Sequence, residues 1–430
     1  MTHRKVGWEC PAIYLRVPSS KLKHATINST GWRIGGIPVA NVTNFGLTDE
    51  QQLFRETVRR LAVDKVQSRA AEIDETGEFP WDIVGLFRDY GLIGVAMPEE
   101  YGGGGADLLT FCIAVEEIAR VCATSALIIA AQHLGAMPIL IAGNDDQKAR
   151  YLPAIAQGKR LSAFALTEPE AGSDAGGMKT RAIRDGKQYQ LSGSKVFITN
   201  GGIAKTMVVF ASTDPAKGTH GVSAFVVELD QPGVSVGRIE KKMGIRGSQT
   251  AQLLFDNVII DASNRLGEEG EGFKIAMRTL DRTRPGIAAQ ALGIAQGALD
   301  VAVDYLYQRR QFGVSLSQLE GLQFMVADMQ TQVESSRQLL YRTAEIVETA
   351  GFESQASCEV TRYSAMAKLM CSDTAMRVTT DAVQLLGGYG YVQDYPLERM
   401  MRDAKITQIY EGTNQIQKLV IFRNMDHGGM

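Results

Sequence analysis

The sequence is poor in the residues that build metal sites and disulfide frameworks. It has five cysteines and five histidines among 430 residues, and no two cysteines stand in a C-x-x-C arrangement. Structural zinc sites use such clusters, and small secreted domains carry a much higher density of cysteine. We therefore expect no metal site and a protein of a reducing compartment.

An excess of positive charge is also absent. Lys and Arg number 45 against 48 Asp and Glu, which gives a formal net charge of −3. Proteins that bind nucleic acid or anionic membrane surfaces through charge carry a clear positive excess. This balance argues against both kinds of partner.

Long uninterrupted apolar runs are lacking too. A membrane-spanning helix needs roughly 20 consecutive apolar residues, and the most apolar stretch, 123–141, contains Gln132, His133, Gly135 and Pro138. We predict no membrane span. Hydrophobic residues make up 45% and charged residues 22% of the chain, as in folded globular proteins. At roughly 150 residues per domain, the length predicts about three domains.

Residues 1–44 differ in composition from the rest, because six are basic and only Glu9 is acidic. No periodicity predicts helices or strands there, so we interpret the segment as an unstructured leader or a mis-started N-terminus. One interpretation is a mitochondrial transit peptide, which would place the protein in the mitochondrial matrix. We favour a bacterial reading frame opened too far upstream, since Gly35-Gly36 before Val39 is compatible with a ribosome site ahead of a GTG start. The expected location is then the bacterial cytoplasm.

The pattern from 45 to 160 is helical. Thr48 and Gln51 form a capping-box signature at the start of a helix, and Phe54, Val58 and Leu61 follow at helical spacing. Further helices are predicted at about 82–92, 107–130 and 145–157. We expect an N-terminal helical domain.

The segment 161–267 changes to short apolar runs that are typical of strands. These runs lie at 161–166, 195–199, 206–212, 222–229 and 252–260. Asp185-Gly186 supplies a hairpin turn. The middle third is predicted to be a β domain.

Helical spacing returns in 268–430. One apolar face is formed by Leu322, Met325, Met329, Val333 and Leu340. A second helix is predicted at 373–386, ended by Gly387-Gly388. Pro285-Gly286 interrupts another helical stretch and either kinks it or ends it. We expect a C-terminal helical domain.

The glycine run 102–105 could be mistaken for a phosphate loop. It lacks the following Lys-Ser/Thr of a P-loop and the strand–helix context of a dinucleotide fold. We predict that it is only a loop.

Two loops of the β domain combine hydroxyls, glycines and stiff or aromatic residues. The first is 166–174 (LTEPEAGSD), where Gly172 allows close backbone approach and Thr167 and Ser173 offer hydroxyls. The second is 197–202 (FITNGG). Together they suggest a planar heteroaromatic ligand, and the alternative is a pair of ordinary polar turns.

A third segment, 409–416 (IYEGTNQI), places Glu411 between an aromatic residue and a glycine. A carboxylate in an apolar turn has a raised pKa, as a general base requires. The alternative is an acid near Thr413 that stabilises the start of a helix through its dipole.

At these residues the chain resembles the acyl-CoA dehydrogenase family, from about Phe45 to Phe422. The resemblance rests on motifs in family order at 98–103 (PEEYGG), 166–174, 242–248 (KMGIRGS), 309–313 (RRQFG), 384–391 (QLLGGYGY) and 410–413 (YEGT). It implies an α+β fold, mainly α: an N-terminal helical domain (45–160), a middle β-barrel or sandwich (161–267) and a C-terminal four-helix bundle (268–430). It also implies a homotetramer with one FAD per subunit.

The resemblance assigns roles residue by residue. FAD-binding residues would be Leu166, Thr167, Ser173, Phe197, Ile198, Thr199, Arg309, Phe312, Gln384, Leu385, Leu386, Gly387, Gly388, Thr413 and Gln415. Acyl-CoA would meet Ser173, Asp281, Arg284 and Gly412. Arg309, Phe312 and 384–388 would serve the FAD of a neighbouring subunit, so each site would need two chains.

Three positions depart from the family pattern. Phe197 stands where many members have Trp, Glu320 stands where Gln is usual, and Pro285 lies inside a stretch that is usually helical. Phe197 keeps an aromatic ring. Glu320 has no amide donor, so we assign it no role in the site.

The implied reaction converts a saturated acyl-CoA to the trans-2-enoyl-CoA. Glu411 would remove the α-proton, the β-hydrogen would pass as hydride to N5 of FAD, and electron-transfer flavoprotein would accept the electrons. Some relatives carry the base at the position of Thr283, which cannot serve as one. Alternatives on the same fold are an acyl-CoA oxidase and a decarboxylating dehydrogenase of dicarboxylyl-CoA. The second would need a cation near the acyl tail, and 126–131 (ALIIAA) offers none.

Overall fold

The computed structural model describes residues 33–34, 37–38, 46–351 and 357–425. Apart from strands β1 (Arg33–Ile34) and β2 (Ile37–Pro38), the predictions for 1–44 lie outside the described residues. Contacts divide the chain into Met1–Gln52 and Leu53–Met430. In the first unit, β1 and β2 pair antiparallel.

Helix α1 (Asp49–Leu61) begins with the capping box predicted from the sequence. The backbone N–H of Thr48 donates to Gln51 Oε1, and that of Gln51 donates to Thr48 Oγ1, both at 3.2 Å. These bonds satisfy backbone donors that a helix start leaves without partners.

Further helices follow before the β domain: α2 (Ala70–Thr76), α3 (Trp81–Asp89), α4 (Leu108–Ala119), α5 (Ala123–Ala142) and α6 (Asp145–Ala156). The single helix predicted at 107–130 is wrong, because Cys122 is extended and starts α5. This corner packs tightly on α7: a Cβ added at Gly297 would meet the carbonyl oxygen of Arg120 at 2.0 Å. Apolar periodicity on both sides of the corner conceals the break.

The middle segment forms one connected eight-stranded sheet, of order β10-β7-β6-β4-β5-β9-β8 with β3 also paired to β6. The strands are β3 (Ser162–Ala165), β4 (Arg181–Asp185), β5 (Gln188–Thr199), β6 (Thr206–Ser212), β7 (Val222–Glu228), β8 (Val234–Ile239), β9 (Thr250–Asp261) and β10 (Arg265–Leu266). All five predicted runs lie on strands, and Gly186 (φ 57°) turns the β4–β5 hairpin as predicted. Strands β4, β8 and β10 were not predicted.

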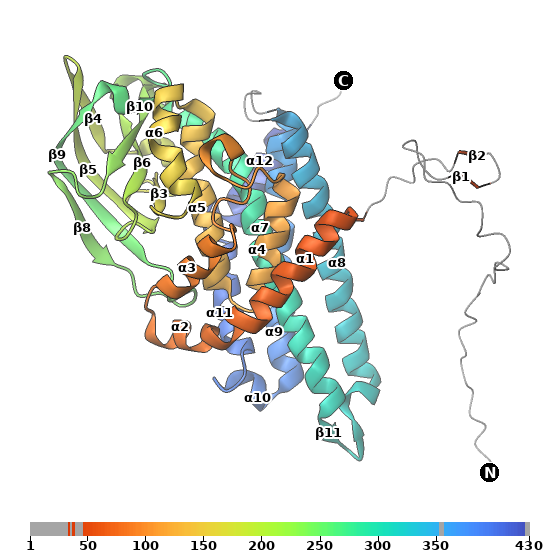
Figure 1. The fold of residues 1–430 in the computed structure, drawn as a ribbon. Coiled ribbons are helices and arrows are strands. Elements are labelled where there is room, and N and C mark those ends of the chain that lie inside the picture. The colour runs from red at the N-terminus through yellow and green to blue at the C-terminus, as the bar shows by residue number, and fades with distance from the viewer. Residues whose placement is uncertain (1–32, 35–36, 39–45, 352–356, 426–430) are drawn as a thin grey trace, which may run out of the picture. The chain divides into compact units, whose positions relative to one another are not determined.

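The C-terminal region contains α7 (Gly272–Gln308), α8 (Glu320–Ala350), α9 (Cys358–Leu386), α10 (Gly388–Tyr391), α11 (Leu397–Thr407) and α12 (Asn414–Arg423), with the hairpin β11 (Arg310–Gln311) and β12 (Val314–Ser315). Helices α7, α8, α9 and α11 pack together as the helical bundle (Figure 1). The helix predicted at 373–386 is the second half of α9.

Pro285 neither ends nor interrupts α7, which continues for 37 residues. Proline lacks the N–H that would bond the carbonyl four residues earlier. That carbonyl, of Asp281, instead accepts a hydrogen bond from Ser364 Oγ on α9 at 2.6 Å. A side chain of the neighbouring helix therefore replaces the missing backbone bond.

Two helices, α5 and α7, are long and apolar enough to cross a membrane. However, 83% and 78% of their most apolar windows are buried inside the protein. This burial is what core helices show, and it accounts for their composition.

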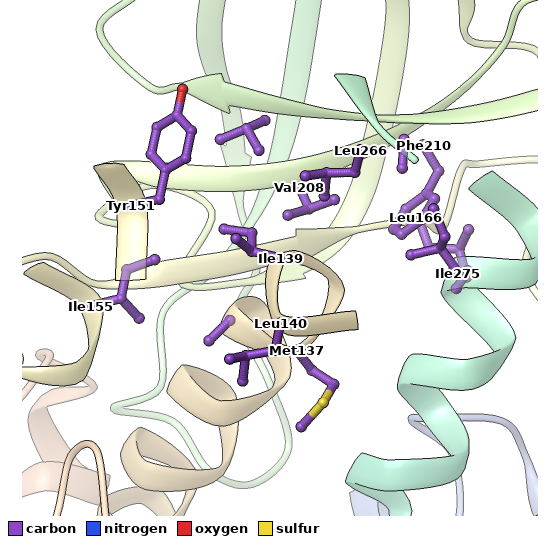
Figure 2. Packing of buried hydrophobic residues seen from close by; sticks show 14 of the residues in the cluster. Met137, Ile139, Leu140, Tyr151, Ile155, Leu166, Val208, Phe210, Leu266 and Ile275 are labelled. Atoms are coloured by element: carbon purple, nitrogen blue, oxygen red, sulfur yellow. The ribbon is translucent and has the colours of Figure 1, made fainter. Parts of the chain in front are cut away.

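A hydrophobic core joins the helices to the sheet (Figure 2). Met137 and Ile139 of α5 and Ile155 of α6 pack with Val208 and Phe210 of β6 and with their neighbours. Leu166, the first residue of the 166–174 loop, belongs to the same cluster. The core therefore anchors the start of that loop.

The glycine run 102–105 is a loop, as predicted. Its four backbone N–H groups donate to the carbonyls of Glu99, Pro98, Gly94 and Met97. None of these donors is left for a phosphate, which agrees with the absence of a P-loop sequence.

Candidate functional site

Glu411 lies in the turn between α11 and α12, with a positive φ of 52°. Its carboxylate Oε2 accepts a hydrogen bond from Thr283 Oγ1 of α7 at 3.0 Å. Thr283 is 3% exposed. Tyr410, the residue before Glu411, is also fixed, because its hydroxyl donates a hydrogen bond to Gln290 of α7. The turn is thus attached to the middle of α7.

Burial raises the pKa of Glu411 to about 7. The hydrogen bond from Thr283 and the positive charges of Arg284 and Lys368 oppose this rise. A carboxyl group that exchanges its proton near neutral pH suits general base chemistry. The arrangement can therefore accept a proton from a ligand that reaches the turn.

The alternative interpretation of Glu411, as the acid that begins α12, is not what the structure shows. Thr413 caps that helix, and its hydroxyl accepts a hydrogen bond from the N–H of Ile416. The Glu411 carboxylate points to α7 instead, where it contacts Thr283.

Asp281 and Arg284 form a buried ion pair with 2.7 Å between Oδ1 and Nη1. The other carboxylate oxygen of Asp281 accepts from Thr361 Oγ1 at 2.7 Å. Arg284 Nε lies 3.5 Å from the carbonyl oxygen of Glu411. The structure places both residues beside the turn that carries Glu411. Their contact with CoA stays a prediction.

The two predicted flavin loops lie together, because the N–H of Val196 on β5 donates to the carbonyl of Thr167 at 2.9 Å. Leu166 and Ile198 are buried, and Thr167 and Thr199 are half-buried. Ser173 is exposed. The ring of Phe197 is 65% exposed on a backbone with φ 59°.

A buried ion pair that the sequence did not reveal connects these loops. Lys195, at 0% exposure, donates to Glu168 Oε1 at 2.7 Å and to the carbonyl of Leu166 at 2.8 Å. Glu168 also accepts from the N–H groups of Lys179 and Thr180. The pair holds β5 and the 166–174 loop at a fixed spacing.

Most of the other predicted cofactor residues form a separate group near the end of α7. Arg309 follows α7 and lies 5.4 Å from the Tyr389 ring centroid, and Phe312 is 91% exposed with φ 53°. Gln384 is exposed, Leu385 and Leu386 are buried, and Gly387 and Gly388 join α9 to α10. In Figure 1, β11 and α10 lie at the end of the bundle away from the sheet.

Length along α7 separates the two groups within one chain. Arg309 is 26 residues beyond Thr283, which at 1.5 Å per residue is about 39 Å. Thr413 and Gln415 lie close to Glu411 in sequence, at the start of α12, with Gln415 exposed. Glu320 begins α8 and is exposed. The structure brings together Glu411, Thr283, Asp281, Arg284 and Gly412, but not Arg309 and Phe312.

The residues present fit a flavin dinucleotide. Exposed aromatic rings at Phe197 and Phe312 have no function in the core of this chain and suit stacking against planar rings. Half-buried hydroxyls at Thr167 and Thr199 offer donors and acceptors beside Phe197. Among the described residues, no group of three His, Cys, Asp or Glu side chains could hold a metal ion.

Comparison with known proteins agrees with this fit. Family models match in order: acyl-CoA dehydrogenase N-terminal domain at 48–159, middle domain at 163–258 and C-terminal domain at 270–425. The short-chain specific acyl-CoA dehydrogenase of Clostridium acetobutylicum is 50% identical over 379 residues, which are 88% of this chain and 98% of that protein.

Two solved structures share the fold. Butyryl-CoA dehydrogenase from Megasphaera elsdenii is 45% identical with a TM-score of 0.84, over 88% of this chain and 99% of that one. A chain from a structure named for the electron transferring flavoprotein of Acidaminococcus fermentans is 46% identical with a TM-score of 0.86, over 89% and 100%. This chain belongs to the FAD-dependent acyl-CoA dehydrogenase family.

Proposed function

We propose that the protein dehydrogenates a short, uncharged acyl-CoA to its trans-2-enoyl-CoA, with Glu411 as the base that takes the α-proton. The observation that carries this proposal is the half-buried side chain of Glu411, whose pKa is raised to about 7 and whose Oε2 accepts a hydrogen bond from Thr283. The chemistry that FAD supplies when bound is acceptance of the β-hydrogen as hydride.

Thr283 and Glu411 have different roles in the proposed reaction. The Thr283 hydroxyl orients the carboxylate through its hydrogen bond of 3.0 Å. The N–H of Glu411 is the donor we assign to the thioester oxygen, because charge develops there as the α-proton leaves. Gly412 leaves room beside it, since only hydrogen stands at its Cα.

The acyl tail is proposed to lie along α5. Residues 126–131 of this helix are buried and carry no charge. Burying the carboxylate of a dicarboxylyl tail against them without a partner would cost several kcal/mol. A glutaryl-CoA kcat/KM above that of butyryl- and octanoyl-CoA would contradict this assignment.

The partners proposed for the holoenzyme are three more copies of this chain and electron-transfer flavoprotein. The separation of about 39 Å along α7 supports FAD sites completed by a second chain. Support for electron-transfer flavoprotein is the lack of a Gly-x-Gly-x-x-Gly unit for a nicotinamide dinucleotide. Steady turnover with NAD as sole acceptor would contradict it. We place the protein in the bacterial cytoplasm, as its bacterial relatives suggest.

The test is anaerobic bleaching of the FAD-loaded protein by acyl-CoAs of graded length, with Glu411→Gln as the matched variant. The amide is nearly isosteric but cannot take the α-proton. We expect bleaching by butyryl-CoA, and a loss of about 10⁴-fold or more in Glu411→Gln. Bleaching of that variant at the parent rate would show that another group is the base.

A further inference from the structure

The turn that carries Glu411 has an unusual backbone. Glu411 and Gly412 both have positive φ, of 52° and 93°. For glutamate this conformation is strained, and it persists only where neighbours impose it. Gln417 Nε2 supplies part of that restraint, because it donates to the carbonyls of Glu411 at 3.1 Å and of Gly412 at 2.9 Å.

Lys368 of α9 supplies a further restraint. Its side chain is fully buried. Its Nζ donates to the carbonyl of Gly412 at 2.8 Å and to Asn414 Oδ1 at 2.9 Å. Asn414 is in turn bonded to Asp373 Oδ1 at 2.7 Å. Lys368 therefore holds the chain on both sides of Thr413.

The contacts of Lys368 leave its charge without a direct counter-charge. Within the described part of the chain, no carboxylate oxygen lies within 4 Å of its Nζ. A buried ammonium bonded only to neutral acceptors is costly for the fold. Two neutral donors would hold the turn as well, so restraint alone does not account for a lysine here.

The charged groups around Lys368 identify its electrostatic partner. Glu411 in the turn and Asp373 on its own helix raise its pKa through their negative charge, and Arg284 of α7 lowers it. Arg284 is paired with Asp281 at 2.7 Å. Burial lowers the pKa of Lys368 to about 7, and the negative charge of Glu411 opposes that fall. The effect is mutual, since Lys368 lowers the pKa of Glu411.

We propose that Lys368 is a positioning residue of the reaction, which fixes the Glu411 turn and supplies, beside Arg284, a positive charge that favours the ionised form of Glu411 until it takes the α-proton. This role rests on the proposed function of Glu411. It assigns two separable tasks to one side chain: hydrogen bonds to the turn, and a charge near the carboxylate.

Two substitutions separate the tasks. Lys368→Gln keeps N–H donors for the turn but removes the charge, and Lys368→Met removes both. Lys405→Gln is the matched control, because Lys405 is exposed on α11 and donates only to Gln408. All variants are compared as FAD-loaded protein after their flavin content and thermal unfolding have been checked.

The first measurement is an isotope-edited infrared titration of the Glu411 carboxyl in the resting protein, with Glu411→Gln as the blank. Both Lys368 variants should raise the pKa of Glu411 by about one unit, because they remove a nearby positive charge that stabilises the carboxylate. Lys405→Gln should leave it unchanged. A Glu411 titration that is the same in Lys368→Gln and the parent would overturn the electrostatic role.

The second measurement is the pH profile of kcat/KM. The acid limb should move upward by the same amount in both variants, which gives about a tenfold loss well below neutral pH. At high pH, Lys368→Gln should return to within a few fold of the parent, and Lys368→Met should stay lower. Equal plateaus for Gln and Met would overturn the restraint of the turn.

These results distinguish this proposal from the proposed function. If the infrared titration moves while Glu411→Gln still bleaches with acyl-CoA, Lys368 controls the carboxyl but Glu411 is not the base. If Glu411→Gln is inactive and the titration does not move, Glu411 is the base and Lys368 has no electrostatic role.

Discussion

Thr283 is the residue that touches the Glu411 carboxylate directly, and its hydroxyl lowers the pKa of that group. Thr283→Val keeps the shape of the side chain but removes the donor. We expect the pKa of Glu411 to rise by about one unit, which is the value of one hydrogen bond to a charged group. The acid limb of kcat/KM should move upward accordingly. Thr283→Ser keeps the hydroxyl, so superimposable profiles for Val and Ser would contradict the role of this bond.

The same contact predicts that the base can be moved to α7. Thr283 Oγ1 lies 3.0 Å from Glu411 Oε2, so a carboxylate at 283 would reach the same region. Thr283→Glu in a Glu411→Gln background should recover part of the bleaching by butyryl-CoA. A folded, FAD-loaded double variant with no more activity than Glu411→Gln would show that position 283 does not face the α-carbon.

At this scale the sequence predicts some residues and conceals others. Glu411 is visible because an aromatic residue and a glycine flank it in a short motif. Lys195 and Lys368 are concealed, because their partners are backbone carbonyls and side chains of other elements. In sequence each is only a lysine on a strand or a helix, and polar residues there are most often exposed.

Among the elements, α7 depends on a contact that replaces a backbone bond. Ser364→Ala should leave the buried carbonyl of Asp281 without a donor, and should lower the free energy of unfolding by about 1–3 kcal/mol. Pro285→Ala restores the N–H that this carbonyl lacks. The cost of Ser364→Ala should therefore largely vanish in a Pro285→Ala background. Additive costs in this double-mutant cycle, measured by chemical denaturation, would contradict the replacement.

The loops 166–174 and 197–202 depend on the Lys195–Glu168 pair. Lys195→Met leaves a buried carboxylate without its cation, and should lower the free energy of unfolding by about 3–5 kcal/mol. The affinity of Lys195→Met for FAD should also fall, because both loops shift. Adding Glu168→Gln removes the uncompensated charge but keeps an acceptor for the N–H groups of Lys179 and Thr180.

The double variant should recover much of both quantities, as measured by denaturation at a fixed FAD concentration and by FAD titration. If Lys195→Met is as stable as the parent, this ion pair does not support the loops.

The elements that the sequence predicts well are those with strong local periodicity, such as the strand at 206–212 and the second half of α9. The sequence misleads, or leaves the outcome open, where tertiary contacts decide. The break between α4 and α5 follows from close packing on Gly297, and the continuity of α7 through Pro285 follows from Ser364. Neither partner is near in sequence. The predicted domain limits at 160/161 and 267/268 lie in the segments between α6 and β3 and between β10 and α7.

For the whole molecule, the length of α7 determines what one chain can do alone. Thr283 lies on this helix beside the turn that carries Glu411, and Arg309 follows the helix about 39 Å further along. The predicted FAD residues near the Glu411 turn and those around Arg309 are therefore too far apart within one chain to close around the same cofactor. The proposed symmetric assembly would solve this problem, because the far end of one chain could meet the near end of another.

Subunit mixing tests this arrangement. Glu411→Gln chains lack the base, and Arg309→Glu chains would repel the FAD diphosphate that we assign to Arg309. Each protein alone should be inactive. When the two chains are co-expressed with different tags and purified as mixed assemblies, a site that takes Glu411 from one chain and Arg309 from the other is intact. Random mixing should restore activity at about a quarter of the sites, while about half of the sites, those that take Arg309 from a Glu411→Gln chain, should hold FAD tightly. The same proteins combined after separate purification serve as the control without exchange. If each site lies within a single chain, no mixed site is intact, and mixed assemblies without activity above that control would contradict the two-chain site.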